Sequence, residues 1–141
     1  MKPQSCKNKG RRLQKYVAST ILQTFPHLTT DDCFSTSMGA PGEDIRMSTA
    51  ARASIPFSFE CKNVERINIW ACIEQCKSNS GPHVPCLVFS RNKSETWACL
   101  PWQSLLELVK ASQNGRVPPR IRDLVNDLMD ALNDHEDKTT V

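Results

Sequence analysis

The chain has 141 residues, of which 39% are hydrophobic and 23% charged, the size and composition of a single globular domain. No apolar run approaches the roughly 18 residues needed to span a bilayer. The basic segment 1–15 is not followed by the apolar stretch of a secretory signal. We therefore expect one core with no second catalytic domain, no membrane partner and a cytoplasmic location.

The net charge of +3 hides an uneven distribution. Residues 1–15 carry six basic side chains and no acid, whereas residues 123–141 hold six acids against a single lysine. A basic body favours a polyanion partner through counterion release, and an acidic end can mask that surface. A solvated surface with a basic N-terminal arm explains the charge equally well, so charge alone does not establish nucleic-acid binding.

The cysteine content favours packing over chemistry. There are seven cysteines and no CxxC pair, and an odd number without a secretory signal argues against a disulfide framework. Cys72 and Cys76 lie one helical turn apart, but a structural zinc site needs two further ligands. We predict reduced thiols that serve as small apolar residues.

Hydrophobic spacing and turn residues predict the order of the elements. The first half is predicted as a flexible basic arm over 1–9, a helix over 11–24, strands over 31–36 and 43–47 around a turn at 37–42, a short Ala-rich turn or helix over 48–52, and a strand over 55–62. The second half is predicted as a helix over 65–78, a central strand over 84–90, a basic turn at 91–94, a strand over 97–100, and a helix from Pro101.

This order implies an α/β domain with a central mixed β-sheet flanked by helices. We place the core domain at 10–113, a linker at 114–119, an amphipathic helix at 120–134 and a tail at 135–141. The apolar stripe of helix 120–134 either packs on the core or joins two protomers in a homodimer. Trp97 and Trp102 are expected in the core, and Trp70 in the core or on a partner surface.

Three side chains form the candidate chemical constellation. Glu60 and Lys62 are two residues apart on a predicted strand, so their side chains leave the same face. Asp44 lies on a neighbouring strand, and two carboxylates can hold Mg²⁺ (or Mn²⁺) through oxygen ligands. Lys62 could then orient the attacking water or neutralise the negative charge of the phosphate in the transition state. Burying these charges for structure alone costs several kcal/mol.

The segment from about Gly10 to Pro101 resembles the PD-(D/E)xK nuclease superfamily, whose restriction-endonuclease-like core has the same order of elements. It is most similar to a small phage- and prophage-encoded branch thought to be nucleases, with Holliday-junction resolvases as more distant relatives. The stretches that carry this resemblance are GRRLQ, STSMGAPGEDI, PFSFECKN, NIWACIEQ and VFSRN. Two departures are Glu43 in place of the usual proline before the motif Asp, and Gln14 where resolvases have an acid.

The resemblance implies a metal-dependent DNA endonuclease acting in DNA processing, recombination or packaging. It implies that Asp44, Glu60 and the Cys61 backbone carbonyl bind the metal. Lys62 would be the catalytic lysine and Gln75 a glutamine beside the site. Glu43 would be a supporting acid or substitute ligand. Two alternatives stay open: a catalytically inactive DNA-binding or assembly module with the same fold, and a zinc-binding regulator that uses the helical cysteine pair.

Nucleic-acid contacts are expected from the basic arm, the first helix, the turn before the motif Asp and the basic turn after the central strand. Arg and Lys side chains and small hydroxyls are the usual phosphate contacts. A simple solvated role is about as compatible with each of these positions. The expected contacts are Lys9, Arg11, Arg12, Ser37, Arg91 and Lys93.

Overall fold

The computed structural model describes residues 3–37 and 39–113. It contains two compact units, Met1–Pro101 and Trp102–Val141, and each is considered by itself. In the first unit the elements are α1 (Pro3–Thr24), β1 (Cys33–Ser35), β2 (Ile45–Met47), α2 (Thr49–Ser54), β3 (Phe57–Asn63), α3 (Ile69–Asn79), β4 (Val84–Ser90) and β5 (Trp97–Cys99). The described part of the second unit contains α4 (Trp102–Gln113).

The larger sheet has the strand order β3-β4-β5. β3 pairs with β4 in parallel, with Glu60 opposite Leu87, and β4 pairs with β5 antiparallel, with Phe89 opposite Trp97. The crossover between the parallel strands is α3. The predicted mixed α/β architecture and the central place of strand 84–90 are therefore confirmed. β3 lies at one edge of this sheet, which leaves its outer side open to the segment that carries Asp44.

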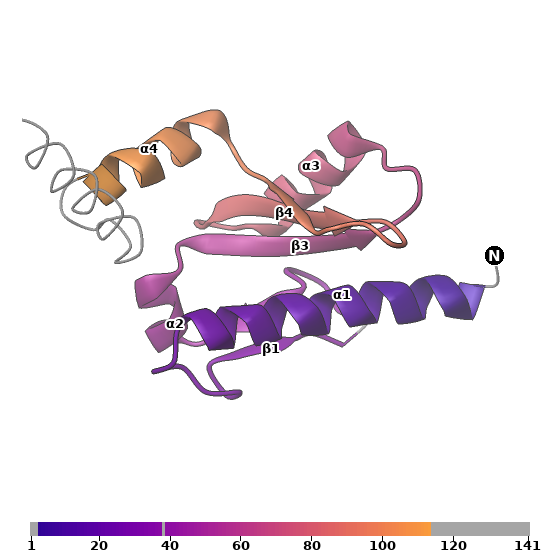
Figure 1. Cartoon of the computed structure of the whole chain (residues 1–141), viewed down its shortest axis with the longest axis horizontal. Coiled ribbons are helices and arrows are strands. Elements are labelled where there is room, and N and C mark those ends of the chain that lie inside the picture. The colour runs from indigo at the N-terminus through magenta and orange to yellow at the C-terminus, as the bar shows by residue number, and fades with distance from the viewer. Residues whose placement is uncertain (1–2, 38, 114–141) are drawn as a thin grey trace, which may run out of the picture. The chain divides into compact units, whose positions relative to one another are not determined.

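Two helices cover opposite faces of the sheet, α1 on one and α3 on the other (Figure 1). The main core lies between α1 and the strands, because α1 presents apolar residues at helical spacing. Its buried members are Leu13, Val17, Ala18, Cys33, Ile45, Cys61, Cys86 and Val88. On the other face, Ser58 and Glu60 are only 2% and 3% exposed. The polar side of β3 is therefore deeply buried as well.

The strands β1 and β2 do not join that sheet. They form a separate antiparallel pair in which Phe34 lies opposite Arg46. One backbone hydrogen bond links this pair to β3, from the Asp44 N–H to the Phe59 carbonyl at 3.1 Å. The single central sheet expected from the sequence is thus divided in two, with Asp44 at the joint.

Residues 1–9 are predicted to form a flexible arm, whereas the described residues from Pro3 onward belong to the helix α1. Proline is well tolerated at the first helical position. The residues that follow are mostly Lys, Gln and Asn, which a solvated helix accepts at little cost. The described basic residues of this segment are therefore held on a helix rather than on a loose chain.

The tryptophan side chains are more exposed than the sequence predicts. Trp97 and Trp102, expected in the core, are 59% and 66% exposed, and Trp70 is 74% exposed. In α4 no side chain is buried. Among the described residues, no helix is long and apolar enough to cross a bilayer. The predicted linker 114–119, helix 120–134 and tail 135–141 lie outside the described residues.

Candidate active site

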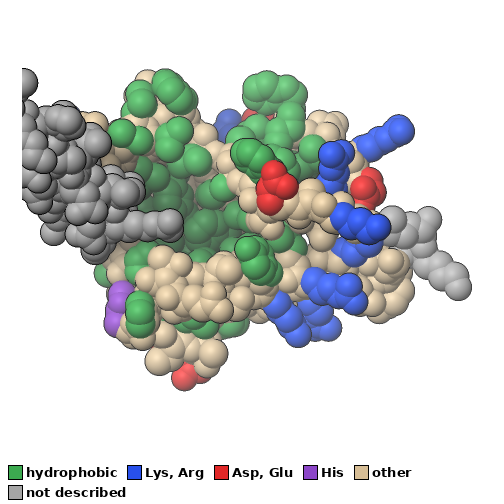
Figure 2. All heavy atoms as spheres, viewed as in Figure 1, with side chains coloured by type: hydrophobic (Ala, Val, Ile, Leu, Met, Phe, Trp, Pro, Cys, Tyr) green, Lys and Arg blue, Asp and Glu red, His purple; other side chains and the backbone are tan. Residues whose placement is uncertain are grey.

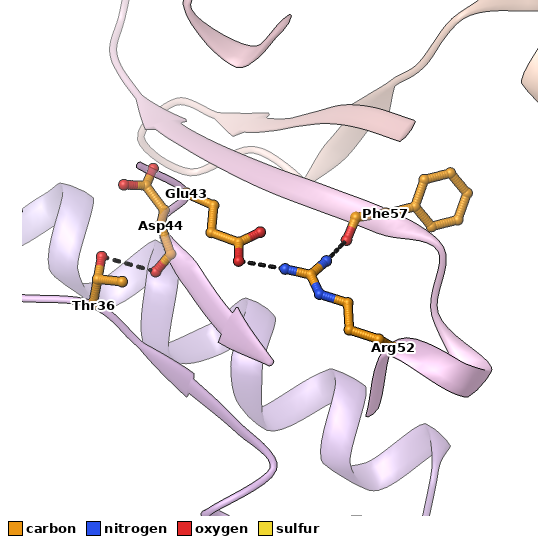
Figure 3. A network of polar contacts seen from close by, with 5 residues as sticks. All are labelled: Thr36, Glu43, Asp44, Arg52 and Phe57. Atoms are coloured by element: carbon orange, nitrogen blue, oxygen red, sulfur yellow. Dashed lines mark hydrogen bonds and ion pairs between the residues drawn. The ribbon is translucent and has the colours of Figure 1, made fainter. Parts of the chain in front are cut away.

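Asp44 is fixed by hydrogen bonds to its backbone and to one oxygen of its carboxylate. Its backbone carbonyl accepts from the Thr36 N–H at 2.8 Å and from the Thr36 hydroxyl at 3.2 Å (Figure 3). Its side-chain Oδ2 accepts from the backbone N–H of Cys61 at 2.7 Å. These bonds hold the carboxylate against the open edge of β3, beside the residues that the sequence grouped with it.

Glu60 and Lys62 leave the α3 face of β3, as their two-residue spacing predicts. The Lys62 Nζ lies 3.0 Å from Glu60 Oε1 and donates to Gln75 Oε1 at 2.9 Å. The second Glu60 oxygen, Oε2, accepts from the Asn79 amide at 3.2 Å. Lys62 therefore connects the strand acid to the predicted glutamine. α3 supplies both amides because Gln75 and Asn79 are one turn apart.

These residues share one cavity of about 370 Å³. Its walls come from α1, the loop before β2, β3 and α3. The lining residues are Gly10, Gln14, Gly39, Ala40, Pro41, Gly42, Asp44, Glu60, Cys61, Lys62, Gln75 and Asn79. The four predicted catalytic residues, which span more than thirty positions of the sequence, are thus brought together.

The electrostatics of the cavity disfavour two bare carboxylates. Burial raises the pKa of Asp44, and the neighbouring Glu60 carboxylate raises it further. The Cys61 N–H, the Lys62 ammonium and the Gln14 amide act in the opposite direction but do not cancel the rise in the Asp44 pKa. A cation between the two acids would offset the cost of burying the Asp44 charge and its repulsion from Glu60. The charge distribution therefore suits a cation site.

The donor set fits a magnesium ion. Mg²⁺ prefers oxygen ligands and is commonly held by one or two carboxylates together with water. The Cys61 N–H points to Asp44 rather than to β4, and in an extended strand the carbonyl of the same residue projects to the same edge. Asp44, Glu60 and the Cys61 carbonyl could therefore share a cation. In the part of the chain that the structure describes, no group of three or more His, Cys, Asp or Glu side chains forms a metal site.

Glu43 lies apart from this cavity. Its carboxylate pairs with Arg52, which also donates to the Phe57 carbonyl, and the Asp44 and Glu43 carboxylates point in opposite directions (Figure 3). Glu43 is thus held by an ion pair outside the lining of the cavity. Its ion pair attaches the start of β2 to α2 and to the start of β3.

Two polar side chains of the cavity, those of Asn79 and Gln14, were not singled out from the sequence as members of the site. Asn79 follows Gln75 by one helical turn, a spacing that could have revealed it. Gln14 is only 5% exposed, and its Oε1 is buried without a hydrogen-bond partner. Its signal is a polar residue inside the apolar stripe of α1, between Leu13 and Val17. An unpaired buried acceptor costs about 1–3 kcal/mol, so Gln14 is an expensive residue for a purely structural wall.

The predicted nucleic-acid contacts lie on exposed parts of the first unit. Arg11 and Arg12 are exposed on α1, where Lys9 is half-buried. Lys93 is exposed in the β4–β5 turn, where its φ of 56° is left-handed. Figure 2 shows Lys and Arg side chains gathered at the end of the molecule where the N-terminal half of α1 and this turn lie. Ser37, at the start of the loop before Asp44, and Arg91 are also exposed.

The thiols behave as packing residues. Burial raises the pKa of Cys76 to about 11 and that of Cys86 to about 12, and it raises the pKa of Cys61 further still. Thiols of this kind stay protonated at neutral pH, whereas metal ligation and nucleophilic attack require the thiolate. Cys76, one of the two cysteines of the zinc alternative, is therefore suited to packing.

Comparisons of the chain with protein-family models, with curated proteins and with solved structures give no match. The functional interpretation therefore depends on the geometry and chemistry of the cavity.

Proposed function

We propose that this chain is a metal-dependent DNA endonuclease of the PD-(D/E)xK type. One observation carries the proposal: Asp44, Glu60, Lys62 and Gln75 line a single cavity at the edge of a mixed sheet. The sequence resemblance had grouped the same four residues, and the folded geometry supports that grouping independently. The exposed cations on α1 and in the β4–β5 turn supply the attraction that a phosphate backbone requires.

In this proposal each residue has a distinct role. The cation, Mg²⁺ or Mn²⁺, would be held by Asp44, Glu60 and the Cys61 carbonyl. Its positive charge would polarise a water molecule and stabilise the negative charge of the phosphate in the transition state. Each carboxylate has spare lone pairs beyond its present hydrogen bonds, because an ionised carboxylate can accept about four. Lys62, whose Nζ contacts Glu60, would neutralise charge that develops on the phosphate oxygens. Gln75 fixes the position of the Lys62 ammonium.

A cleavage assay tests the proposal directly. The full chain is incubated with labelled single-stranded, duplex and branched DNA in Mg²⁺, Mn²⁺ or EDTA. We expect cleavage with either metal and none with EDTA. Glu60→Gln should abolish it, because the substitution removes a ligand charge and keeps the size of the side chain.

The matched control is Glu74→Gln, the same chemical change on the exposed surface of α3, where Glu74 contacts Lys77. It should cleave at the parent rate. Equal rates for the two variants, or no metal-dependent cleavage of any substrate, would contradict the proposal. Intact DNA binding without cleavage would favour the alternative of an inactive DNA-binding module.

A further inference from the structure

A second hollow, of about 510 Å³, lies on the first unit apart from the candidate active site. Its walls come from α1, the end of β3 and the segment between β4 and β5. The residues that characterise it are Arg12, Tyr16, Asn63, Ser94, Glu95 and Thr96. None of them lines the first cavity, and none belongs to the proposed catalytic group.

The lining combines three kinds of recognition chemistry. Tyr16 is 53% exposed, so much of its ring is available at the surface. Arg12 is exposed beside it on α1, and Glu95 is exposed across the hollow. The Asn63 Oδ1 is buried without a hydrogen-bond partner. Because Asn63 lines the wall, rotation about its side-chain bonds would present this acceptor to a ligand in the hollow.

An unpaired nucleobase matches this combination. Aromatic rings bind single-stranded bases by stacking, and arginine binds the phosphate that follows. Asn and carboxylate side chains recognise the exocyclic amino groups of adenine and cytosine. Thymine lacks an exocyclic amino group and can donate only through its ring N3–H. The hollow is thus suited to a base that stacks on the ring and donates hydrogen bonds through an exocyclic amino group.

The hollow and the first cavity are built on the same two elements. Asn63 follows Lys62 in β3 but leaves the opposite face of the strand, and α1 contributes Gly10 and Gln14 to the first cavity but Arg12 and Tyr16 to the second. Both sites therefore adjoin the same helix. Arg11 and Lys15, exposed on α1, provide cations along the outer surface of the helix between them.

We propose that this second hollow binds an unpaired DNA base that carries an exocyclic amino group, next to the site of cleavage. The inference rests on the proposed nuclease function for the identity of the polymer. It extends that function by naming the substrate class: DNA with a single-stranded nucleotide beside the cut, with adenine or cytosine preferred over thymine in the hollow.

Binding of labelled homopolymers by the full chain in EDTA tests this inference without cleavage. We expect oligo(dA) and oligo(dC) to bind more tightly than oligo(dT) by fluorescence anisotropy. Tyr16→Ala should weaken binding of all three about tenfold, the scale of one lost base stack. Trp70→Ala is the matched control, because it removes an exposed aromatic ring that does not line the hollow, and it should change affinity little.

Two substitutions test the base preference. Asn63→Leu keeps the size and removes the acceptor, so the preference over oligo(dT) should shrink. Glu95→Gln, in an exposed turn where folding is not at risk, should reduce the preference for oligo(dC). Thermal denaturation of each variant confirms that it is folded.

The outcomes separate the two proposals. Equal affinity for the three homopolymers, or equal effects of Tyr16→Ala and Trp70→Ala, would overturn the base-binding inference even if the chain cleaves DNA with Mg²⁺. A base preference that depends on Asn63 and Glu95, in a chain that never cleaves, would retain the binding site and reject the nuclease.

Discussion

Without a bound cation, the ionised Asp44 carboxylate destabilises the folded chain. Its pKa in the folded chain is raised above the ordinary value of 3.8, chiefly by burial. The folded state therefore keeps the proton to higher pH than the unfolded chain. The contribution of Asp44 to the free energy of unfolding falls as pH rises through this window, so the ionised group destabilises the empty fold at pH 7.

We expect Asp44→Asn to raise the melting temperature at pH 7 in EDTA, because it removes the buried charge and keeps an acceptor for the Cys61 N–H. The same variant should lose most of the stabilisation that Mg²⁺ or Mn²⁺ gives the parent. Thermal denaturation with and without metal measures both effects.

Asp32 is a control of opposite sign. Hydrogen bonds from the Ser48 hydroxyl and the Thr29 N–H lower the pKa of Asp32, so its ionised form stabilises the fold above its unfolded pKa. Asp32→Asn should lower the melting temperature at pH 7. A fall for both variants would show that charge burial does not govern the Asp44 effect.

Lys62 should matter more in the transition state than in the bound state. We expect Lys62→Ala to lower the single-turnover cleavage rate by about 10²–10³, the scale of a lost oxyanion donor. Metal binding should survive, since the proposed ligands remain, and calorimetric Mn²⁺ titration checks this. Lys62→Arg should rescue poorly because a planar fork replaces a point charge.

Lys77→Ala, a surface lysine of α3 that contacts Glu74, is the matched control for Lys62 and should cleave normally. Full activity in Lys62→Ala would contradict the proposed role. So would the loss of metal binding in that variant.

Most of the charged and amide side chains of the site could be predicted from the sequence, but on different grounds. Glu60 and Lys62 could be paired from the two-residue period of a strand alone. Asp44 was expected beside them from its place on a neighbouring predicted strand. The place of Gln75 followed only from the family resemblance, because no local rule relates residues so distant in sequence. Gln14 could not be assigned, because whether a glutamine within an apolar stripe has a partner depends on which loop covers it.

Among the elements, α1 is the one whose role changed most between sequence and structure. Because residues 3–9 are helical, Lys7, Arg11 and Lys15 recur at intervals of four and form an exposed basic stripe. A fixed stripe presents phosphate contacts at defined spacing, whereas a loose arm would bind without register.

In the double variant Lys7→Gln, Arg11→Gln, we expect the plot of log affinity for DNA against log salt concentration to become less steep. The magnitude of its slope should fall by about 2, with binding still measurable. Substituting Arg46, an exposed residue of β2, by Gln should leave the slope unchanged. An unchanged slope in the double variant would remove the stripe from the DNA-binding surface.

Element boundaries were predictable where a local signal exists. Strand 84–90 was placed correctly because its apolar run ends in polar residues. α3 begins at Ile69 and not at 65, because the Asn68 side chain accepts from the Ala71 N–H at 3.2 Å and caps the helix there. The separation of β1 and β2 from the larger sheet was not predictable, because strand pairing is decided by long-range contacts.

At the scale of the whole molecule, all the candidate site residues and the buried core lie in the first unit. The division between the two units falls at Pro101, within the predicted core domain of 10–113. We expect a fragment of residues 1–101 to fold cooperatively and to retain metal-dependent cleavage. Circular dichroism on heating and the cleavage assay measure this, and an unfolded fragment would show that the second unit is needed for stability.

The hydrogen bond from the Cys61 amide to Asp44 Oδ2 gives the protein a built-in spectroscopic reporter. This amide proton lies on an edge strand and is held by a side chain instead of a neighbouring strand, so its exchange with solvent is governed by that carboxylate. Its nuclear magnetic resonance signal should shift when Asp44 gains a proton or a cation. Occupancy of the site can thus be followed at a single backbone atom, with no DNA present and no reaction under way.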